Sequence, residues 1–302
     1  MDKKRLLLIV NPASGIGKIK SQLFKVVDIF SRGGYEVTVY PTKARRDAEL
    51  KAFSSAKDYD LLVCAGGDGT LNETVTGVIK SGANVPLGYI PAGTLNEWSS
   101  GLKISRNIET AAKDIVGGKL ATLDLGGFDD KYFTYTASFG AFTEASYSAP
   151  QDVKNILGQA AYFFEGIKSL GNIKPITLTV KTETKTVTGD FLFGAVTNSF
   201  SVGGVVRLNE ALVTLNDGFF EVLLIRNPAN IAELQNIIDG ILKIDFNRRG
   251  IEFLRAAEIV VESGKPIDWT LDGEHARSDG TVKIRNLKNH LKLIVPDRLK
   301  NT

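Results

Sequence analysis

Residues 60–79 read DLLVCAGGDGTLNETVTGVI, and this stretch decides the fold. The unbroken apolar run 61–65 is typical of a short strand buried on both faces. Gly66-Gly67-Asp68-Gly69-Thr70 follows at once, and apolar residues then recur at helical spacing: Leu71, Val75, Val78 and Ile79. The pattern predicts a strand, a glycine-rich turn and a helix.

The chemistry of this turn suits phosphate. Its three glycines let the backbone approach an anion closely. The unpaired N–H groups that open the next helix favour negative charge, and Asp68 adds a carboxylate where a phosphate-bound metal would need one. The alternative is an ordinary turn in which Asp68 or Thr70 only caps the helix. GGDGT matches neither GxxxxGK[ST] nor GxGxxG, which indicates a different kind of nucleotide site.

Composition narrows the class of protein. The 302 residues are 43% hydrophobic and 24% charged, with a net charge of +3, so nucleic acid is not an expected partner. Cys64 is the only cysteine, which rules out an internal disulfide, and two histidines exclude a His-rich zinc site. No segment has the length of a signal sequence or a membrane span. We expect a cytoplasmic protein.

Strands and helices alternate over the first 126 residues. This order predicts a parallel sheet covered on both faces, in which ligands bind beyond the carboxyl ends of the strands. Asn11, Thr42, the 66–70 turn and Thr94 each follow a strand end. The expected strands are 6–10, 35–40, 61–65, 85–90 and 121–125, and the expected helices are 19–32, 44–56, 71–79 and 108–116.

The rest of the chain reads mostly as strands. Alternation such as Thr177-Leu178-Thr179-Val180 favours antiparallel strands with one wet face. A helix at 152–170 is expected to pack inward or, as the lesser alternative, to contact lipid. A second helix is expected at 231–242. The expected strands are 131–139, 175–182, 187–197, 218–225, 257–262, 267–271, 281–285 and 291–295.

Five motifs together resemble one family, the bacterial diacylglycerol kinase-like lipid kinases. These include the soluble diacylglycerol kinase of Gram-positive bacteria and the YegS-like enzymes, with sphingosine kinases and NAD kinases more distant. The resemblance covers essentially the whole chain. The motifs are Asn11-Pro12-Ala13-Ser14-Gly15, GGDGT at 66–70, Pro91-Ala92-Gly93-Thr94-Leu95-Asn96, Asn216-Asp217-Gly218 and Leu271-Asp272-Gly273-Glu274.

The resemblance implies a fold and a set of site residues. It implies a Rossmann-like α/β ATP-binding domain at 1–126, to which 291–302 could return, a β-sandwich lipid domain at 127–290, and an active site in the cleft between them. Glu274 would be the general base, with Asp68, Asp124 and Asp272 in an acidic network around the reacting phosphate. Thr214, Asp217 and Phe219 would hold a structural Mg²⁺. The implied ATP contacts are Asn11, Ser14, Thr42, Gly66, Gly67, Asp68, Gly69, Thr70, Asn72 and Thr94.

Simpler interpretations remain open for three of these carboxylates. Asp272-Gly273 is also a good signal for a hairpin turn between 267–271 and 281–285, and Asp217-Gly218 has the same alternative. Asp124 could simply cap a neighbouring segment at a strand end. The family usually has Asn-Asp-Phe where this chain has Asn96-Glu97-Trp98.

We therefore expect an ATP- and Mg²⁺-dependent kinase that phosphorylates a lipid hydroxyl, and the expected lipid is diacylglycerol. Its contact with the membrane surface would be transient, and a homodimer is one option for its assembly. The rival enzyme is a NAD-kinase-like phosphotransferase that uses the same turn. A rival of another class is a nucleotide-binding regulator with weak catalysis.

Overall fold

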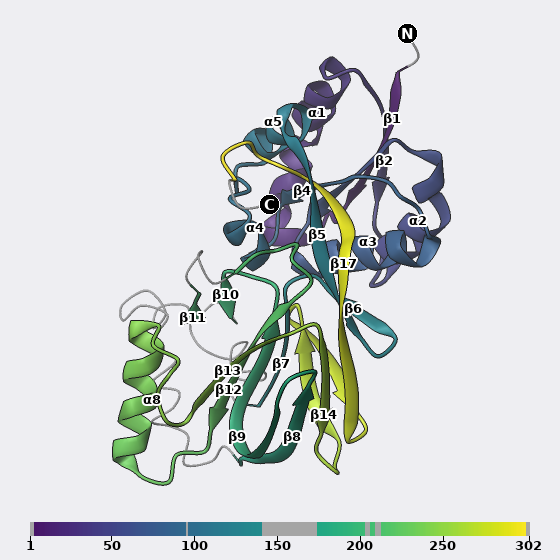
Figure 1. Cartoon of the computed structure of the whole chain (residues 1–302). Coiled ribbons are helices and arrows are strands. Elements are labelled where there is room, and N and C mark those ends of the chain that lie inside the picture. Colours follow the sequence, from purple (N-terminus) through teal and green to yellow (C-terminus); the bar gives the residue numbers. More distant parts are fainter. Residues whose placement is uncertain (1–2, 95, 141–173, 203–205, 209–212, 300–302) are drawn as a thin grey trace. The chain divides into compact units, whose positions relative to one another are not determined.

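The computed structural model describes residues 3–94, 96–140, 174–202, 206–208 and 213–299 (Figure 1). The chain divides into two compact units. Unit 1 comprises Met1–Leu125 and Lys288–Thr302, and unit 2 comprises Gly126–Leu287. The expected helix at 152–170 lies outside the described residues. Among those residues, no helix is long and apolar enough to cross a bilayer.

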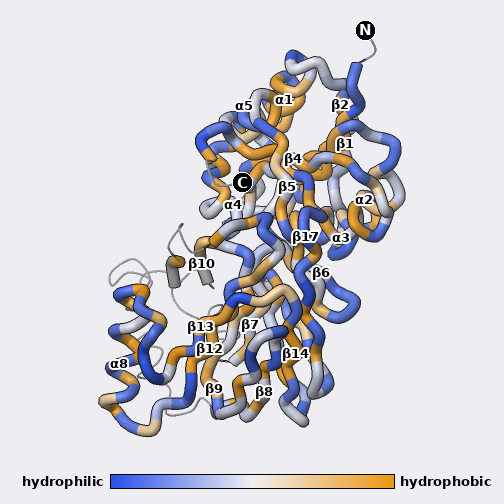
Figure 2. The backbone as a smooth tube through the Cα atoms, viewed as in Figure 1, coloured by the Kyte–Doolittle hydropathy of each residue, from blue (hydrophilic) through white to orange (hydrophobic). Residues whose placement is uncertain are grey.

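Unit 1 is an α/β domain built on parallel strands, as expected. Its strands run in the order β2-β1-β3-β4-β17, with parallel pairing throughout and with β5 beside β17. The three inner strands are apolar and buried, as a sheet covered on both faces requires (Figure 2). The strands are β1 (Lys4–Val10), β2 (Tyr35–Pro41), β3 (Leu61–Gly66), β4 (Leu87–Pro91), β5 (Lys119–Phe128) and β17 (Thr281–Val295).

The helices of unit 1 pack in pairs. Helix α1 contacts α5, and α2 contacts α3. Each pair covers a different face of the sheet (Figure 1). A short helix, α4, was not predicted. The helices are α1 (Lys18–Arg32), α2 (Asp47–Ser55), α3 (Asp68–Ser81), α4 (Glu97–Gly101) and α5 (Ile108–Gly117), with 3-10 turns at Ser14–Gly17 and Ala56–Asp58.

Unit 2 is β-rich, as expected, and all of its described pairings are antiparallel. Its core includes Trp269, whose ring meets Phe128 and Phe139 edge-on at 5.1 and 4.8 Å. The elements are β6 (Lys131–Phe133), β7 (Thr136–Gly140), β8 (Ile176–Thr182), β9 (Thr186–Thr197), β10 (Ser201–Val202), β11 (Val206–Arg207), β12 (Phe220–Arg226), α8 (Ile231–Lys243), β13 (Ile251–Ala256), β14 (Glu258–Glu262), β15 (Ile267–Leu271) and β16 (Glu274–Ser278).

Several predicted boundaries were wrong. The expected strands 281–285 and 291–295 are parts of one strand, β17, which also includes the residues between them. The expected strand 131–139 is divided into β6 and β7. The expected hairpin joining 267–271 to 281–285 instead joins β15 to β16, a strand that was not predicted. Strand β13 was also missed.

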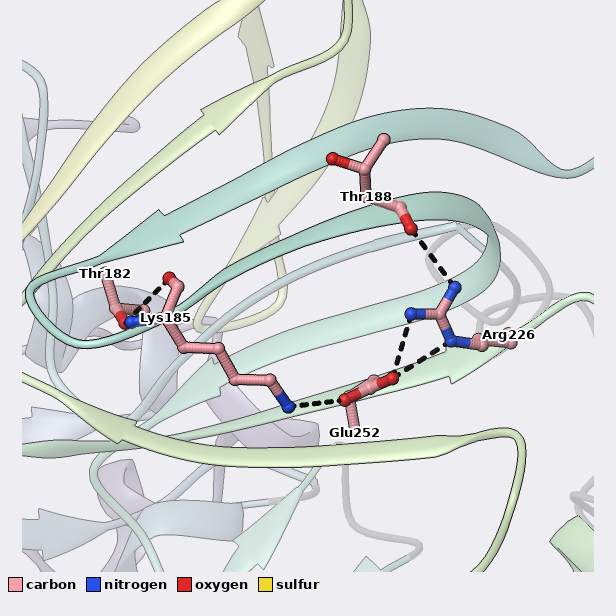
Figure 3. A network of polar contacts seen from close by, with 5 residues as sticks. All are labelled: Thr182, Lys185, Thr188, Arg226 and Glu252. Carbon is pink, nitrogen blue, oxygen red and sulfur yellow. Dashed lines mark hydrogen bonds and ion pairs between the residues drawn. The ribbon is translucent and has the colours of Figure 1, made fainter.

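Strand β9 holds unit 2 together by changing neighbours along its length. Its first half pairs with β8, and its second half pairs with β7 on one edge and β12 on the other. Near this change the Arg226 guanidinium donates two hydrogen bonds to Glu252, at 3.0 and 2.8 Å, and one to the Thr188 carbonyl (Figure 3). Lys185 donates to the other oxygen of Glu252 at 3.0 Å.

Arg226 and Lys185 outweigh the effect of burial on the pKa of Glu252. Burial alone would raise the pKa of this carboxyl, but the hydrogen bonds and charges of Arg226 and Lys185 lower it below its ordinary value. A depressed pKa in the folded state stabilises the protein above the unfolded-state pKa, and that contribution is lost as the pH falls through the folded-state pKa.

We predict that Glu252→Gln lowers the free energy of unfolding by about 1–2 kcal/mol at pH 7, because hydrogen bonds to a charged acceptor are replaced by weaker ones. The difference from wild type should shrink as the carboxyl is protonated at acid pH. Urea unfolding at several pH values measures it. Glu262→Gln is the matched control, because the Glu262–Lys181 pair is exposed and should contribute little. Equal losses in both variants would contradict the prediction.

Candidate active site

Three loops of unit 1 meet closely at the carboxyl ends of β1, β3 and β4. A Cβ atom added at Gly93 would lie 2.6 Å from the Cα atom of Gly67, and one added at Gly15 would lie 2.1 Å from the carbonyl oxygen of Ala92. Real Cβ atoms do not approach backbone so closely. Glycine is required at both positions for the loops to meet, and Gly15 also has a φ of +50°.

Helix α3 begins inside this group of loops. Its N-cap is Gly67, and within the described part of the chain no side chain caps it. Asp68 and Thr70 lie inside the helix, at its first and third positions, so neither is its N-cap residue. Thr70 instead accepts a hydrogen bond from the Asn11 side chain at 3.0 Å, which ties the loop after β1 to the helix. The backbone N–H groups of the first turn are the donors that suit a phosphate.

Asp68 is held by the loop after β4. Its Oδ2 atom accepts the backbone N–H of Glu97 at 3.0 Å, and the Tyr89 hydroxyl lies 3.4 Å from Oδ1. The same hydroxyl lies 3.3 Å from Oδ1 of Asn96, which in turn binds both backbone polar groups of Gly93. Burial, and then the charge of Asp68, raises the pKa of Tyr89 well above its ordinary value, so the phenol remains a donor.

For the other residues of unit 1 that were expected to contact the nucleotide, the structure shows only the element beside which each one lies. The backbone N–H of Thr42 donates to the Val10 carbonyl at 2.8 Å, and that of Ser14 donates to the Asn11 carbonyl at 3.2 Å. Both residues therefore stand beside the end of β1. Gly69 and Asn72 lie on α3. Thr94 is exposed in the loop after β4.

Asp124 is fully buried on β5, and its Oδ1 atom accepts the backbone N–H of Asn289 at 2.8 Å. Asn289 has a φ of +57°, a conformation that asparagine tolerates better than most residues. The carboxylate therefore fixes an unusual point in β17. This contact supports the interpretation of Asp124 as a cap, and its expected part in the acidic network stays a prediction.

Asp272 lies in unit 2 and ties two segments together. It forms the β15–β16 turn with Gly273, and both have positive φ, +49° and +87°, as a two-residue Asp-Gly hairpin requires. Its buried carboxylate accepts four hydrogen bonds, at 2.5 to 3.1 Å, from the backbone N–H groups of Thr134, Tyr135 and Thr136 and the hydroxyl of Thr134. The turn interpretation is therefore correct as geometry, although the strand that follows is β16.

Glu274 begins β16 directly after this turn and is exposed. A rigid, doubly anchored turn is a suitable support for a group that must be placed accurately beside a substrate. The structure thus places the expected base next to an anchored aspartate. Its chemical role stays a prediction.

The expected metal loop lies before β12. Asp217 Oδ1 accepts the backbone N–H of Phe219 at 2.9 Å, and Oδ2 pairs with the Arg255 guanidinium. Neighbouring Glu221 is buried, and burial raises its pKa to about 8 despite the nearby Arg255 charge. Among the described residues, no group of three or more His, Cys, Asp or Glu side chains could hold a metal ion. A metal here would need carbonyl oxygens, as the expectation of Thr214 and Phe219 states.

The comparisons with known proteins agree on one family. Residues 5–128 match the diacylglycerol kinase catalytic domain. A diacylglycerol kinase of Bacillus subtilis is 32% identical over 298 residues, 97% of each chain. The chain belongs to the bacterial diacylglycerol kinase-like family. A diacylglycerol kinase of Staphylococcus saprophyticus is 30% identical over 302 residues, 99% of this chain and 98% of the relative.

The fold agrees as well. A crystal structure of a diacylglycerol kinase from Bacillus anthracis superposes with a TM-score of 0.75 at 20% identity, covering 99% of this chain and 100% of that one. A member of this family is a lipid kinase, a phosphotransferase with an alcohol acceptor. The expected family, fold class and enzyme class are confirmed.

Sequence reasoning missed four residues that organise the site. Tyr89 lies in an apolar strand and reads as an ordinary core residue. Asn96 was quoted in a motif without a role. Glu221 and Arg255 meet only through the pairing of β12 with β13. For Tyr89, the one available signal was a phenol at the end of a strand that leads into a glycine loop.

We predict that Gly93→Ala weakens the binding of an ATP analogue at least about tenfold, because the methyl group would force the loop away from Gly67. Isothermal titration calorimetry measures the affinity. Gly117→Ala is the control, because nothing lies within 4 Å of its added Cβ. Unchanged affinity in a folded Gly93→Ala protein would contradict the prediction.

We predict that Asp272→Asn lowers the free energy of unfolding by about 2–4 kcal/mol, because an amide nitrogen cannot accept from the N–H groups that face it. Denaturant unfolding measures the loss. Asp268→Asn, on the preceding strand and 57% exposed, should change stability by under about 0.5 kcal/mol. A stable Asp272→Asn protein would show that the anchor is not needed for folding.

Proposed function

We propose that this lipid kinase transfers the γ-phosphoryl group of ATP to the free hydroxyl of diacylglycerol and so forms phosphatidic acid. The observation that carries the proposal is the start of α3 at Gly67, an N-cap residue without a capping side chain, framed by glycines that bring three backbone segments together. The named substrate of the curated relatives, diacylglycerol, supports the choice of acceptor.

The proposed nucleotide site lies in unit 1. The first turn of α3 would bind phosphate oxygens through its N–H groups, and Asn11 and Thr70, already joined by a hydrogen bond, would border that site. Ser14, Thr42, Asn72 and Thr94 would complete the contacts with ATP. Asp68, held in place by the Glu97 N–H, would stand near the phosphates.

Mg²⁺ would supply positive charge that offsets the negative charge of the transferring phosphoryl group. Asp68 offers a hard oxygen ligand of the type that this ion prefers. Asp124, with one oxygen committed to Asn289, is proposed as the further acidic residue of this network. Carboxylate oxygens of this kind support the proposal that the ion binds here.

The proposed proton acceptor lies in unit 2. The acceptor hydroxyl of the lipid would lose its proton to Glu274 as its oxygen bonds to the γ-phosphorus and the bond to the ADP oxygen breaks. Asp272 would contribute by fixing the turn from which Glu274 projects, because its carboxylate accepts four hydrogen bonds from the 134–136 segment. The lipid would be collected by transient contact with the membrane surface.

We predict that the wild-type protein, given γ-labelled ATP and Mg²⁺, labels diacylglycerol in mixed micelles in preference to sphingosine or NAD offered in parallel. Glu274→Gln should lose about 10²–10⁴-fold of the activity, as expected for removal of a general base. Asp279→Asn, a carboxylate at the far end of the same hairpin, is the matched control and should keep the wild-type rate.

Each other outcome has a definite meaning. Label in NAD would favour the NAD-kinase-like enzyme, and label in sphingosine would change the lipid. ATP binding without transfer to any acceptor would favour the regulatory protein. Full activity in Glu274→Gln would keep the substrate and reject this residue as the base.

A further inference from the structure

Tyr89 places its hydroxyl group among three oxygen atoms at the carboxyl ends of β3 and β4. The side chain is 1% exposed, and its ring lies in the core of unit 1. The hydroxyl oxygen lies 3.3 Å from Oδ1 of Asn96, 3.4 Å from Oδ1 of Asp68 and 3.4 Å from the Gly66 carbonyl oxygen. A tyrosine hydroxyl carries a single proton, so the surroundings of the three acceptors decide which of them receives it.

The two neutral acceptors each have a nearer donor. The Gly66 carbonyl oxygen accepts the backbone N–H of Ala92 at 2.8 Å. Oδ1 of Asn96 accepts the backbone N–H of Gly93 at 3.0 Å. The third acceptor is a carboxylate oxygen, and a hydrogen bond to a charged acceptor is stronger than one between neutral groups. The hydroxyl proton is therefore directed to Asp68.

Asp68 is thereby held at both of its carboxylate oxygens. Oδ1 faces the Tyr89 hydroxyl, and Oδ2 accepts the backbone N–H of Glu97 at 3.0 Å. A carboxylate fixed at one oxygen can still turn about that bond, and the hydroxyl group opposes this turning. Tyr89 lies on β4, Glu97 begins α4, and Asp68 is the first residue of α3. The segment 89–97 therefore sets the direction of a carboxylate at the start of α3.

We propose that Tyr89 is a positioning residue for phosphoryl transfer, because its hydroxyl group orients the Asp68 carboxylate before the nucleotide arrives. The inference rests on the proposed function, in which Asp68 stands near the phosphates of ATP. A carboxylate that is already oriented needs no reorganisation as charge shifts during the transfer. A carboxylate that must first turn adds to the barrier, so Tyr89 acts on the rate through Asp68.

The geometry also predicts how the effect divides between folding and catalysis. Tyr89→Phe keeps the ring that packs in the core and removes only the hydroxyl group. At 3.4 Å the contact with Asp68 is long for a hydrogen bond, and the two neutral acceptors keep their nearer backbone donors. We therefore expect a small effect on folding and a larger one on transfer, which depends on accurate placement of the groups at the reacting centre.

The first test compares Tyr89→Phe with wild type in the full-length protein, with ATP, Mg²⁺ and diacylglycerol in mixed micelles. The variant should lose at least about tenfold in kcat, while the KM for ATP stays within about twofold of wild type. Tyr35→Phe is the matched control and should keep the wild-type rate, because Tyr35 lies at the amino end of β2. Both variants should unfold within a few degrees of the wild-type Tm.

A second measurement observes the contact itself and needs no turnover. With the tyrosines isotope-labelled at Cζ, the NMR signal that is lost in Tyr89→Phe belongs to Tyr89. The chemical shift of this carbon depends on the hydrogen bond of its hydroxyl group. Asp68→Asn should move the signal, because a neutral amide replaces a charged acceptor. Asp28→Asn, which changes a carboxylate on α1 that is 54% exposed, should leave it in place.

The inference is overturned if a folded Tyr89→Phe protein keeps the wild-type kcat. A higher KM for ATP at unchanged kcat would also overturn it, because Tyr89 would then serve binding and not the transfer step. A Tyr89 signal that does not move in Asp68→Asn overturns it as well. If the wild-type protein labels no lipid, the proposed function fails, and the NMR signal still decides whether the hydroxyl group is directed to Asp68.

Discussion

Close contact between backbone segments at the carboxyl ends of β1, β3 and β4 is the constraint on which the rest of unit 1 depends. Side chains would keep these loops apart, and Gly15 and Gly93 remove that obstacle. The strands themselves are ordinary apolar strands of a covered parallel sheet. The region after their carboxyl ends is what distinguishes them, because three loops share a small space there beside the start of α3.

The polar contacts of this region follow from that constraint. Once the loops meet, Asn11 can reach Thr70, and Tyr89 can reach Asp68 and Asn96. Each contact links residues that are far apart in the sequence but adjacent at the strand ends. A site built in this way is held by backbone geometry first and by side-chain bonds second, which suits recognition of a phosphate group by N–H donors.

The sequence allowed prediction of the features that depend on local patterns. Strand β3 and helix α3 follow from apolar spacing around the GGDGT turn, and the Asp272-Gly273 turn follows from its dipeptide. The long strand β17 was predicted as two strands because residues 286–290, polar except for Leu287, carry no alternating pattern. The roles of Tyr89, Glu221 and Arg255 could not be predicted, because they depend on strand register and on which loops meet.

Asp272 shows that a structural and a functional interpretation of one motif need not compete. Its dipeptide forms the hairpin turn, and its carboxylate binds the segment 134–136. A turn fixed at both its backbone and its side chain gives the following residue, Glu274, a defined position. The sequence signal for a turn and the family motif therefore describe the same feature at two levels.

Strand β17 gives the chain an unusual order of assembly. Its first residues pair with β14 in unit 2, while Leu293 pairs with Leu87 in unit 1. Unit 1 is therefore completed by residues that the ribosome makes only after the whole of unit 2. In topological terms unit 2 is an insertion within unit 1, so a fragment ending near residue 126 would lack the strand beside β4 and expose that edge of its sheet.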